Sequence, residues 1–158
     1  MNDSPVQLFF DDFVLGQKFS GASRLVSQHD VIAFSELTGD KHPIHYDADY
    51  ASKTRFGRPI VHGLHLMSLS AVGASALSDQ IVESMIAFVE QGCRFLRPVF
   101  VGDTVTSRYE VAELLHERGK DWGTLKLKSE LVNDKDEVIL DAFHAYRLRC
   151  RNPAGGAG

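Results

Sequence analysis

Apolar and polar residues alternate along much of the second half of the chain. Valine, serine and tyrosine occupy every second position from Val105 to Val111, with polar or charged residues between them. A similar alternation runs from Leu125 to Leu131. Because a period of two sends successive side chains to opposite faces, both segments are predicted to be strands with one covered face and one wet face. Three more strands are expected, at 18–27, 85–99 and 138–150.

Glycine, proline and asparagine mark the predicted interruptions. Gly92 predicts a bulge within 85–99, and Pro98 predicts the end of that strand, because proline cannot donate to a strand ladder. Gly119 and the cluster at 133–136 predict hairpin turns between the last three strands.

The first half of the chain predicts helices and shaped loops. Apolar residues recur at helical spacing over 28–37, and 47–53 is a second candidate with Asp47 as its N-cap. Residues 62–77 read HGLHLMSLSAVGASAL, with no charge apart from the histidines. A helix that is apolar nearly all round is usually buried. The element order therefore predicts an α+β fold, in which a long central helix is wrapped by a curled antiparallel β-sheet.

Composition narrows the class of protein. The chain has 158 residues, a formal net charge of −4 and 44% hydrophobic residues. This predicts one domain over residues 1–150, with the glycine-rich stretch 151–158 as a flexible tail. The acidic balance argues against nucleic acid as a partner. The chain contains no run of about 18 apolar residues, so no membrane span is expected. The acidic start and the unpatterned Cys93 and Cys150 favour a cytoplasmic protein with reduced thiols.

The densest polar cluster is TGDKHPIH at residues 38–45. Gly39 and Pro43 forbid a regular helix, so a turn here can point Asp40 and His45 into one small volume. A carboxylate beside an imidazole can activate water, because histidine titrates near neutral pH. The alternative is that Asp40 merely caps the turn and His45 packs in the core.

Gly63 stands where the buried helix begins. A free backbone N–H in the first turn can stabilise a developing oxyanion. The alternative is that this glycine only permits close packing at the helix entry.

Two H-x-x-H pairs raise the question of a metal. They are His42 with His45 and His62 with His65. Neither spacing matches a zinc signature, so no metal site is predicted. Four arginines are candidates to bind a phosphate-bearing ligand: Arg55, Arg58, Arg94 and Arg97.

Three segments together resemble the MaoC-like dehydratases, also called (R)-specific enoyl-CoA hydratases or hydratase 2. They are FSELTGDKHPIH at 34–45, FGRPIVHG at 56–63 and RPVFVGD at 97–103. The resemblance covers residues 8–150. It implies a hot-dog fold, which agrees with the helix and strand pattern.

The resemblance also implies a reaction, namely hydration of a trans-2-enoyl-CoA to an (R)-3-hydroxyacyl-CoA and the reverse dehydration. The family's catalytic pair corresponds to Asp40 and His45, and its oxyanion donor to the backbone N–H of Gly63. No cofactor is implied, since the coenzyme A thioester is the substrate. The implied assembly is a homodimer or a dimer of dimers.

One position departs from the family pattern, because His42 stands where the family has asparagine. His42 and Pro43 are expected to support the loop, since a neutral imidazole can still donate one hydrogen bond and accept another. Two other functions stay open. One is an acyl-CoA thioesterase of the same fold, and the other is a non-catalytic acyl-CoA binding protein.

Overall fold

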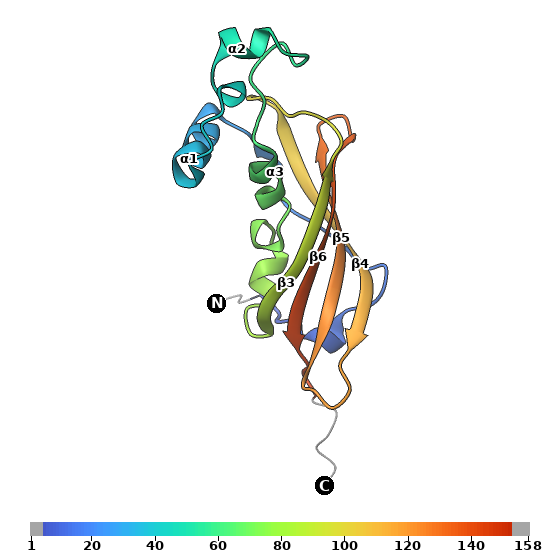
Figure 1. Ribbon diagram of the computed structural model, residues 1–158. Coiled ribbons are helices and arrows are strands. Elements are labelled where there is room, and N and C mark those ends of the chain that lie inside the picture. Colours follow the sequence, from blue (N-terminus) through green and yellow to red (C-terminus); the bar gives the residue numbers. More distant parts are fainter. Residues whose placement is uncertain (1–4, 153–158) are drawn as a thin grey trace.

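The computed structural model describes residues 5–152 and forms one antiparallel sheet with helices on one face and at one end (Figure 1). The sheet has six strands in the order β1-β4-β5-β6-β3, with β2 also paired to β4. The strands predicted around 85–99, 105–111, 125–131 and 138–150 are therefore confirmed. Their bounds are β1 Lys18–Ser20, β2 Arg24–Leu25, β3 Met85–Phe95, β4 Thr104–His116, β5 Trp122–Asn133 and β6 Val138–Arg149.

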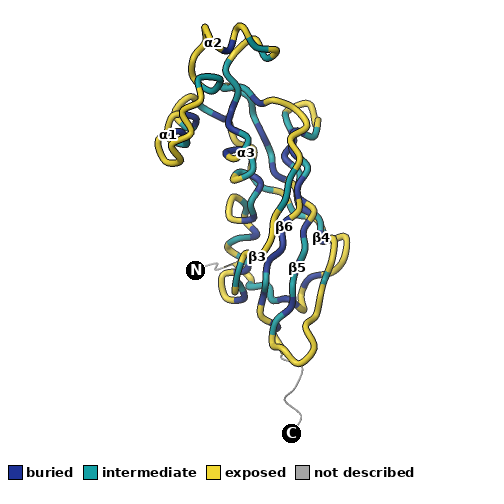
Figure 2. The backbone as a smooth tube through the Cα atoms, in the orientation of Figure 1, coloured by how far each residue is buried: buried dark blue, intermediate teal, exposed yellow. Residues whose placement is uncertain are grey.

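The core lies between this sheet and the crossing segment, residues 63–80, which runs across one face of the sheet (Figure 1). Leu125, Leu127 and Leu131 of β5 are fully buried, as their alternation predicts. They belong to two apolar clusters that also include Leu66 and Leu77 from the crossing segment. In Figure 2 the buried backbone follows that segment and the middle strands, whereas α1 (Gln28–Thr38) and α2 (Ala48–Ser52) are mostly exposed.

Two strand predictions need correction. The expected strand 18–27 is interrupted at Gly21, whose N–H donates to the Ser107 carbonyl between the short strands β1 and β2. Gly92 does not mark a bulge, because the register shifts of β3 lie between Met85 and Glu90. A Cβ on Gly92 would come within 2.6 Å of the Phe143 ring on β6, so this glycine makes room for an aromatic side chain.

The helices of the first half have clear local causes. The first, α1 (Gln28–Thr38), begins at a capping box formed by Ser27 and Asp30. It ends at Gly39, whose φ of 77° is easy only for glycine. Asp47 caps α2 (Ala48–Ser52), as predicted. Short 3₁₀ turns lie at Phe10–Asp12 (η1) and Pro43–His45 (η2).

The prediction of one long continuous central helix is wrong, because the crossing segment is broken into three short helical pieces. They are α3 (Gly63–Leu69), the 3₁₀ turn η3 (Val72–Ala74) and α4 (Leu77–Gln80). The sheet binds the backbone groups that the break releases: Ser129 Oγ donates to the Ser70 carbonyl at 3.0 Å, and the Tyr109 hydroxyl donates to the Ala71 carbonyl at 2.9 Å. The Val72 N–H donates to the Tyr146 hydroxyl oxygen at 3.2 Å. Hydrogen bonds from three strands thus replace those of a continuous helix.

Three buried histidines make stability depend on pH. Burial lowers the pKa values of His62, His65 and His144. The unfolded chain binds more protons than the folded one once pH falls below the unfolded pKa of about 6.5, so stability is lost as the solution is acidified from there. We expect the free energy of unfolding in urea to fall between pH 7.5 and pH 5, by up to about 1.4 kcal/mol per pH unit for each histidine.

The matched variant for this pH dependence is His144→Gln, which removes one of the three groups. Its free energy of unfolding should vary less steeply over the same range. An unchanged slope would mean that His144 binds as many protons in the folded state as in the unfolded state, and would contradict a pKa lowered by burial.

Both ends of the described chain meet at one end of the sheet. Arg151, the first residue of the predicted tail, donates to the Asp12 carboxylate at 2.6 Å and to the Gln7 carbonyl at 2.8 Å. Residues 153–158 of that tail lie outside the described residues. None of the helices in residues 5–152 has the length and apolar character needed to cross a bilayer.

Candidate active site

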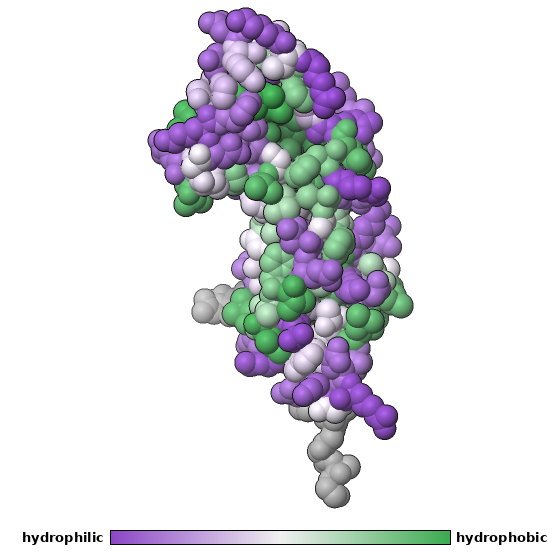
Figure 3. All heavy atoms as spheres, in the orientation of Figure 1, coloured by the Kyte–Doolittle hydropathy of each residue, from purple (hydrophilic) through white to green (hydrophobic). Residues whose placement is uncertain are grey.

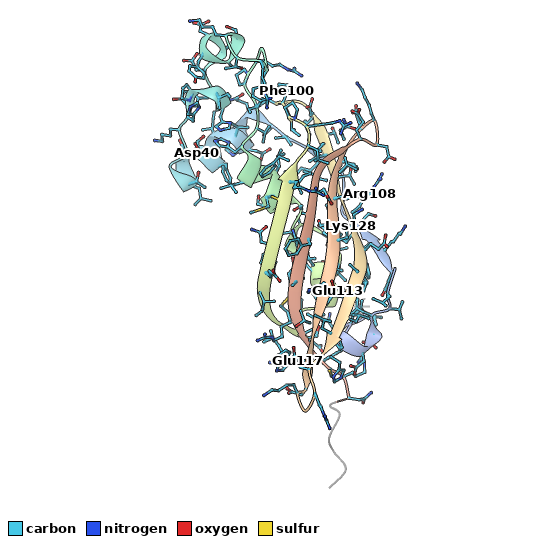
Figure 4. All side chains as sticks on the ribbon, turned by 45° about the vertical axis from the view of Figure 1, so that its right-hand side comes forward. Asp40, Phe100, Arg108, Glu113, Glu117 and Lys128 are labelled. Carbon is cyan, nitrogen blue, oxygen red and sulfur yellow. The ribbon has the colours of Figure 1, made fainter. Side chains whose placement is uncertain are left out.

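The Asp40–His45 loop lies in the head that α1 and α2 form beyond the end of the sheet (Figure 4). Gly39 turns the chain out of α1, and the Thr38 hydroxyl accepts a hydrogen bond from the Asp40 N–H at 3.3 Å. The exposed Asp40 carboxylate accepts from the His42 N–H at 3.4 Å. The loop thus fixes the Asp40 backbone and leaves most of its carboxylate free.

His45 is half-buried and has a defined tautomer. Its Nδ1 lies 2.8 Å from the Ile60 carbonyl oxygen, which can only accept a hydrogen bond. Nδ1 therefore carries the proton, and Nε2 keeps its lone pair. In this form His45 can accept a proton from water.

His62 is a site residue that the sequence interpretation did not single out, except as half of an H-x-x-H pair. Its side chain is 1% exposed, and its ring stacks on His45 with the centroids 3.7 Å apart. Its Nε2 donates to the Asp40 carbonyl oxygen at 3.1 Å and lies 3.1 Å from Ser35 Oγ. Burial lowers the pKa of His62, which favours this neutral form. His62 thereby joins the backbone of Asp40 to the ring of His45.

Asp40 and His45 converge as the loop pattern predicts. Ligand-type atoms of Asp40, His45 and His62 lie within 4.8 Å of one another. Two acceptors at that separation can share one water, because each hydrogen bond to the water spans about 2.8 Å. The arrangement can hold a water between a carboxylate and an imidazole.

Histidines of the two H-x-x-H pairs have other contacts in the structure. His42 Nδ1 accepts from the Ile44 N–H at 3.3 Å, and His65 stacks on Phe34 with centroids 5.2 Å apart. His45 and His62, one from each pair, stack face to face.

His42 and Pro43 lie at the start of the 3₁₀ turn η2. His42 is the N-cap of η2, and Pro43 is the first residue of that turn. The His42 ring also packs edge-on against Tyr50 of α2, with the centroids 5.6 Å apart. An imidazole here therefore joins the loop to α2.

Gly63 is the first residue of α3 and follows His62 directly. Within the described chain, its N–H has no hydrogen-bond acceptor. A Cβ on Gly63 would lie 3.0 Å from the Phe95 ring. Gly63 and Phe95 line a pocket of about 250 Å³, together with Arg55 and Arg97.

The arginines of this region differ in their partners. Arg94 pairs with Asp141 at 2.8 Å, and Arg97 lies 3.6 Å from Glu137. Arg58 stacks over the Phe100 ring and Arg55 over the Phe56 ring. Among residues 5–152, neither Arg55 nor Arg58 forms an ion pair, and only Arg55 of these two lines the pocket beside Gly63.

Comparison with known proteins places the chain in a family. The family model described as "MaoC like domain" matches residues 12–132, which include the loop, Gly63 and most of the sheet. The chain belongs to the MaoC-like dehydratase family. The fold of this MaoC-like protein is the hot-dog fold that the resemblance implied.

Relatives of this MaoC-like protein catalyse addition and removal of water. It is 35% identical to a 3-hydroxybutyryl-CoA dehydratase of Methylorubrum extorquens, over 85% of this chain and 80% of the relative. It is 38% identical to the (R)-specific enoyl-CoA hydratase of Aeromonas caviae, over 66% of this chain and 75% of that enzyme. A solved structure of a monoamine oxidase regulatory protein from Archaeoglobus superposes with a TM-score of 0.87 at 34% identity, over 94% of this chain and 99% of the other. The MaoC-like protein is accordingly a hydro-lyase of the hydratase and dehydratase class.

Proposed function

We propose that this protein hydrates trans-2-enoyl-CoA to (R)-3-hydroxyacyl-CoA and catalyses the reverse dehydration. The observation that carries the proposal is the convergence of the Asp40 carboxylate and the His45 ring within 4.8 Å of each other. The names of the two relatives, a 3-hydroxybutyryl-CoA dehydratase and an (R)-specific enoyl-CoA hydratase, support the same chemistry.

The first step activates one water. The water donates one hydrogen bond to the Asp40 carboxylate and one to His45 Nε2, so its oxygen lone pair faces C3 of the enoyl group. One member of the pair takes a proton as the C3–O bond forms. The pair then returns a proton to C2 on the same face, so the net reaction adds one water.

The second requirement is stabilisation of the enolate-like oxyanion on the thioester carbonyl. We assign this to the Gly63 N–H, which is adjacent in the chain to the residue that stacks on His45. A fixed donor at a developing oxyanion is worth about 3–4 kcal/mol. The carbonyl hydrogen bond also makes C3 more electrophilic before water attacks.

The acyl-CoA phosphates need a cation near this pocket, and we assign Arg55 to them. Arg94 and Arg97 already pair with carboxylates, whereas Arg55 lines the pocket beside Gly63. Arg55→Gln should raise KM for an enoyl-CoA about fivefold, as expected for one exposed charged contact, with little change in kcat. Arg94→Gln is the matched control. An N-acetylcysteamine thioester, which lacks the phosphates, should not distinguish Arg55→Gln from the unaltered protein.

We also propose a homodimer in which the sheet continues across β3, with association of dimers as a further step. Within the described part of the chain β3 pairs only with β6, and it exposes Ile86, Phe88 and Val89. Hydrophobic side chains occupy much of the face on which β3 lies, below the overhanging head of α1 and α2 (Figure 3). Sedimentation velocity at micromolar concentration should give twice the monomer mass. A stable monomer would contradict this assembly.

The decisive experiment is turnover of crotonyl-CoA by the purified protein. We expect its ultraviolet absorbance to fall and chiral analysis to return the (R)-3-hydroxy thioester. If crotonyl-CoA stays intact, longer and carboxylated enoyl-CoAs are tested next, and inactivity on all of them would overturn the proposal. Release of free thiol would identify a thioesterase instead, and binding without turnover would identify a binding protein.

A further inference from the structure

A second cluster of ligand-type side chains lies at the end of the sheet far from Asp40. It combines Asp11 of η1, His116 at the end of β4 and Cys150 just after β6. Figure 4 labels Glu117, the neighbour of His116, near the end of the molecule opposite Asp40. The cluster is therefore separate from the proposed active site.

The three side chains point at one another. Cys150 Sγ lies 3.8 Å from His116 Nε2, and one ligand-type atom of each residue lies within 4.8 Å of the others. A tetrahedral Zn²⁺ with bonds of about 2.3 Å to sulfur and 2.0–2.1 Å to nitrogen separates those two ligands by about 3.6 Å. The observed sulfur–nitrogen separation needs almost no adjustment to fit a shared ion.

Burial and charge in this region suit a cation. The Cys150 thiol is 6% exposed, whereas Asp11 and His116 face solvent and leave an entry path for the ion. The Asp11 carboxylate supplies a negative charge close to the Cys150 sulfur. Asp12, next to Asp11, is already paired with Arg151.

We propose that Asp11, His116 and Cys150 form a binding site for Zn²⁺, with water as the fourth ligand. Thiolate, imidazole and carboxylate are the ligand types that zinc prefers in proteins. Binding converts the Cys150 thiol to a thiolate and releases its proton to solvent. The ion joins η1 to the ends of β4 and β6, so its role is to hold the N-terminal segment on the sheet.

Other contacts already hold η1 against the ends of β4, β5 and β6. Asp11 Oδ2 accepts from the Asn152 N–H at 3.2 Å, and Phe10 packs edge-on against His116 with centroids 5.6 Å apart. The Phe10 ring also occupies the space where a Cβ on Gly123 would lie. These contacts hold residues distant in sequence close together, and a bound ion would stabilise their arrangement.

The test uses Co²⁺ as a spectroscopic probe on the full chain after treatment with a chelator. We expect one equivalent to bind with a near-ultraviolet thiolate-to-cobalt band, which Zn²⁺ then displaces. Cys150→Ser should remove the band. His116→Gln should weaken binding by about tenfold or more, since losing even an outer-shell partner costs that much. Cys93→Ser and Asp40→Asn are the controls and should keep the band.

A stability measurement gives an independent readout. Zn²⁺ at 100 times its Kd should raise Tm by about 8 °C in the unaltered protein and leave Cys150→Ser unchanged. Should Cys150→Ser fail to fold, Asp11→Asn replaces it, because the Asp11 side chain is exposed. Absence of the thiolate band, or its survival in Cys150→Ser, would overturn the site. Neither outcome bears on the hydratase assay.

Discussion

Replacing Asp40 with asparagine should lower kcat/KM for enoyl-CoA hydration by about 10³-fold, which is within the usual contribution of a general acid or base. The substitution keeps the side-chain shape. It also keeps the backbone carbonyl that accepts from His62 and a side-chain oxygen that can accept from the His42 N–H. The loss therefore reports the carboxylate charge and its capacity for a proton. Steady-state kinetics with crotonyl-CoA provide the measurement.

Two comparisons make the Asp40→Asn result specific. Asp49→Asn alters another exposed carboxylate, on the nearby α2, and should leave turnover unchanged. Calorimetric binding of butyryl-CoA, which has no double bond to hydrate, should be the same in Asp40→Asn and the unaltered protein. An active Asp40→Asn variant would remove Asp40 from the mechanism, and loss of binding together with turnover would give it a structural role.

Gly63→Pro should reduce kcat by about 10²- to 10³-fold relative to Gly63→Ala, because the proline ring carbon Cδ replaces the hydrogen of the proposed oxyanion donor. Gly63 is the first helical residue of α3, the position where proline fits a helix best. The preceding His62 has φ −58° and ψ 134°, a conformation that a following proline favours. Backbone geometry should therefore survive the change.

Gly63→Ala is the matched control for the missing N–H. Both variants place a Cβ about 3.0 Å from the Phe95 ring, and that ring is half-exposed and free to shift. Alanine keeps the N–H and proline removes it. Equal turnover in the two variants would show that the Gly63 N–H does not stabilise the transition state, and circular dichroism checks that both fold.

The sequence was most informative where one local rule decides the outcome. Alternation from Val105 to Val111 identified a strand, and Asp47 marked a helix start, because each depends on residues close in the chain. The convergence of Asp40 with His45 was predictable for the same reason, since Gly39 and Pro43 shape the loop between them.

The features that the sequence did not reveal depend on contacts between distant segments. His62 was obscure because its partners, Asp40 and Ser35, precede it by 22 and 27 residues. The aromatic ring that explains Gly92 lies on β6, and no local pattern announces it. Cys150 meets His116 only after β4, β5 and β6 have paired.

The break in the crossing segment has a consequence for the order of folding. The carbonyls of Ser70 and Ala71 and the N–H of Val72 find their partners on β5, β4 and β6. The seven residues of α3 are also too few for a stable isolated helix, which needs about 12–15. We therefore expect the crossing segment to take its native path on a preassembled β4–β5–β6 meander, and the Asp40–His45 loop, which contacts the start of α3 through His62, to order last.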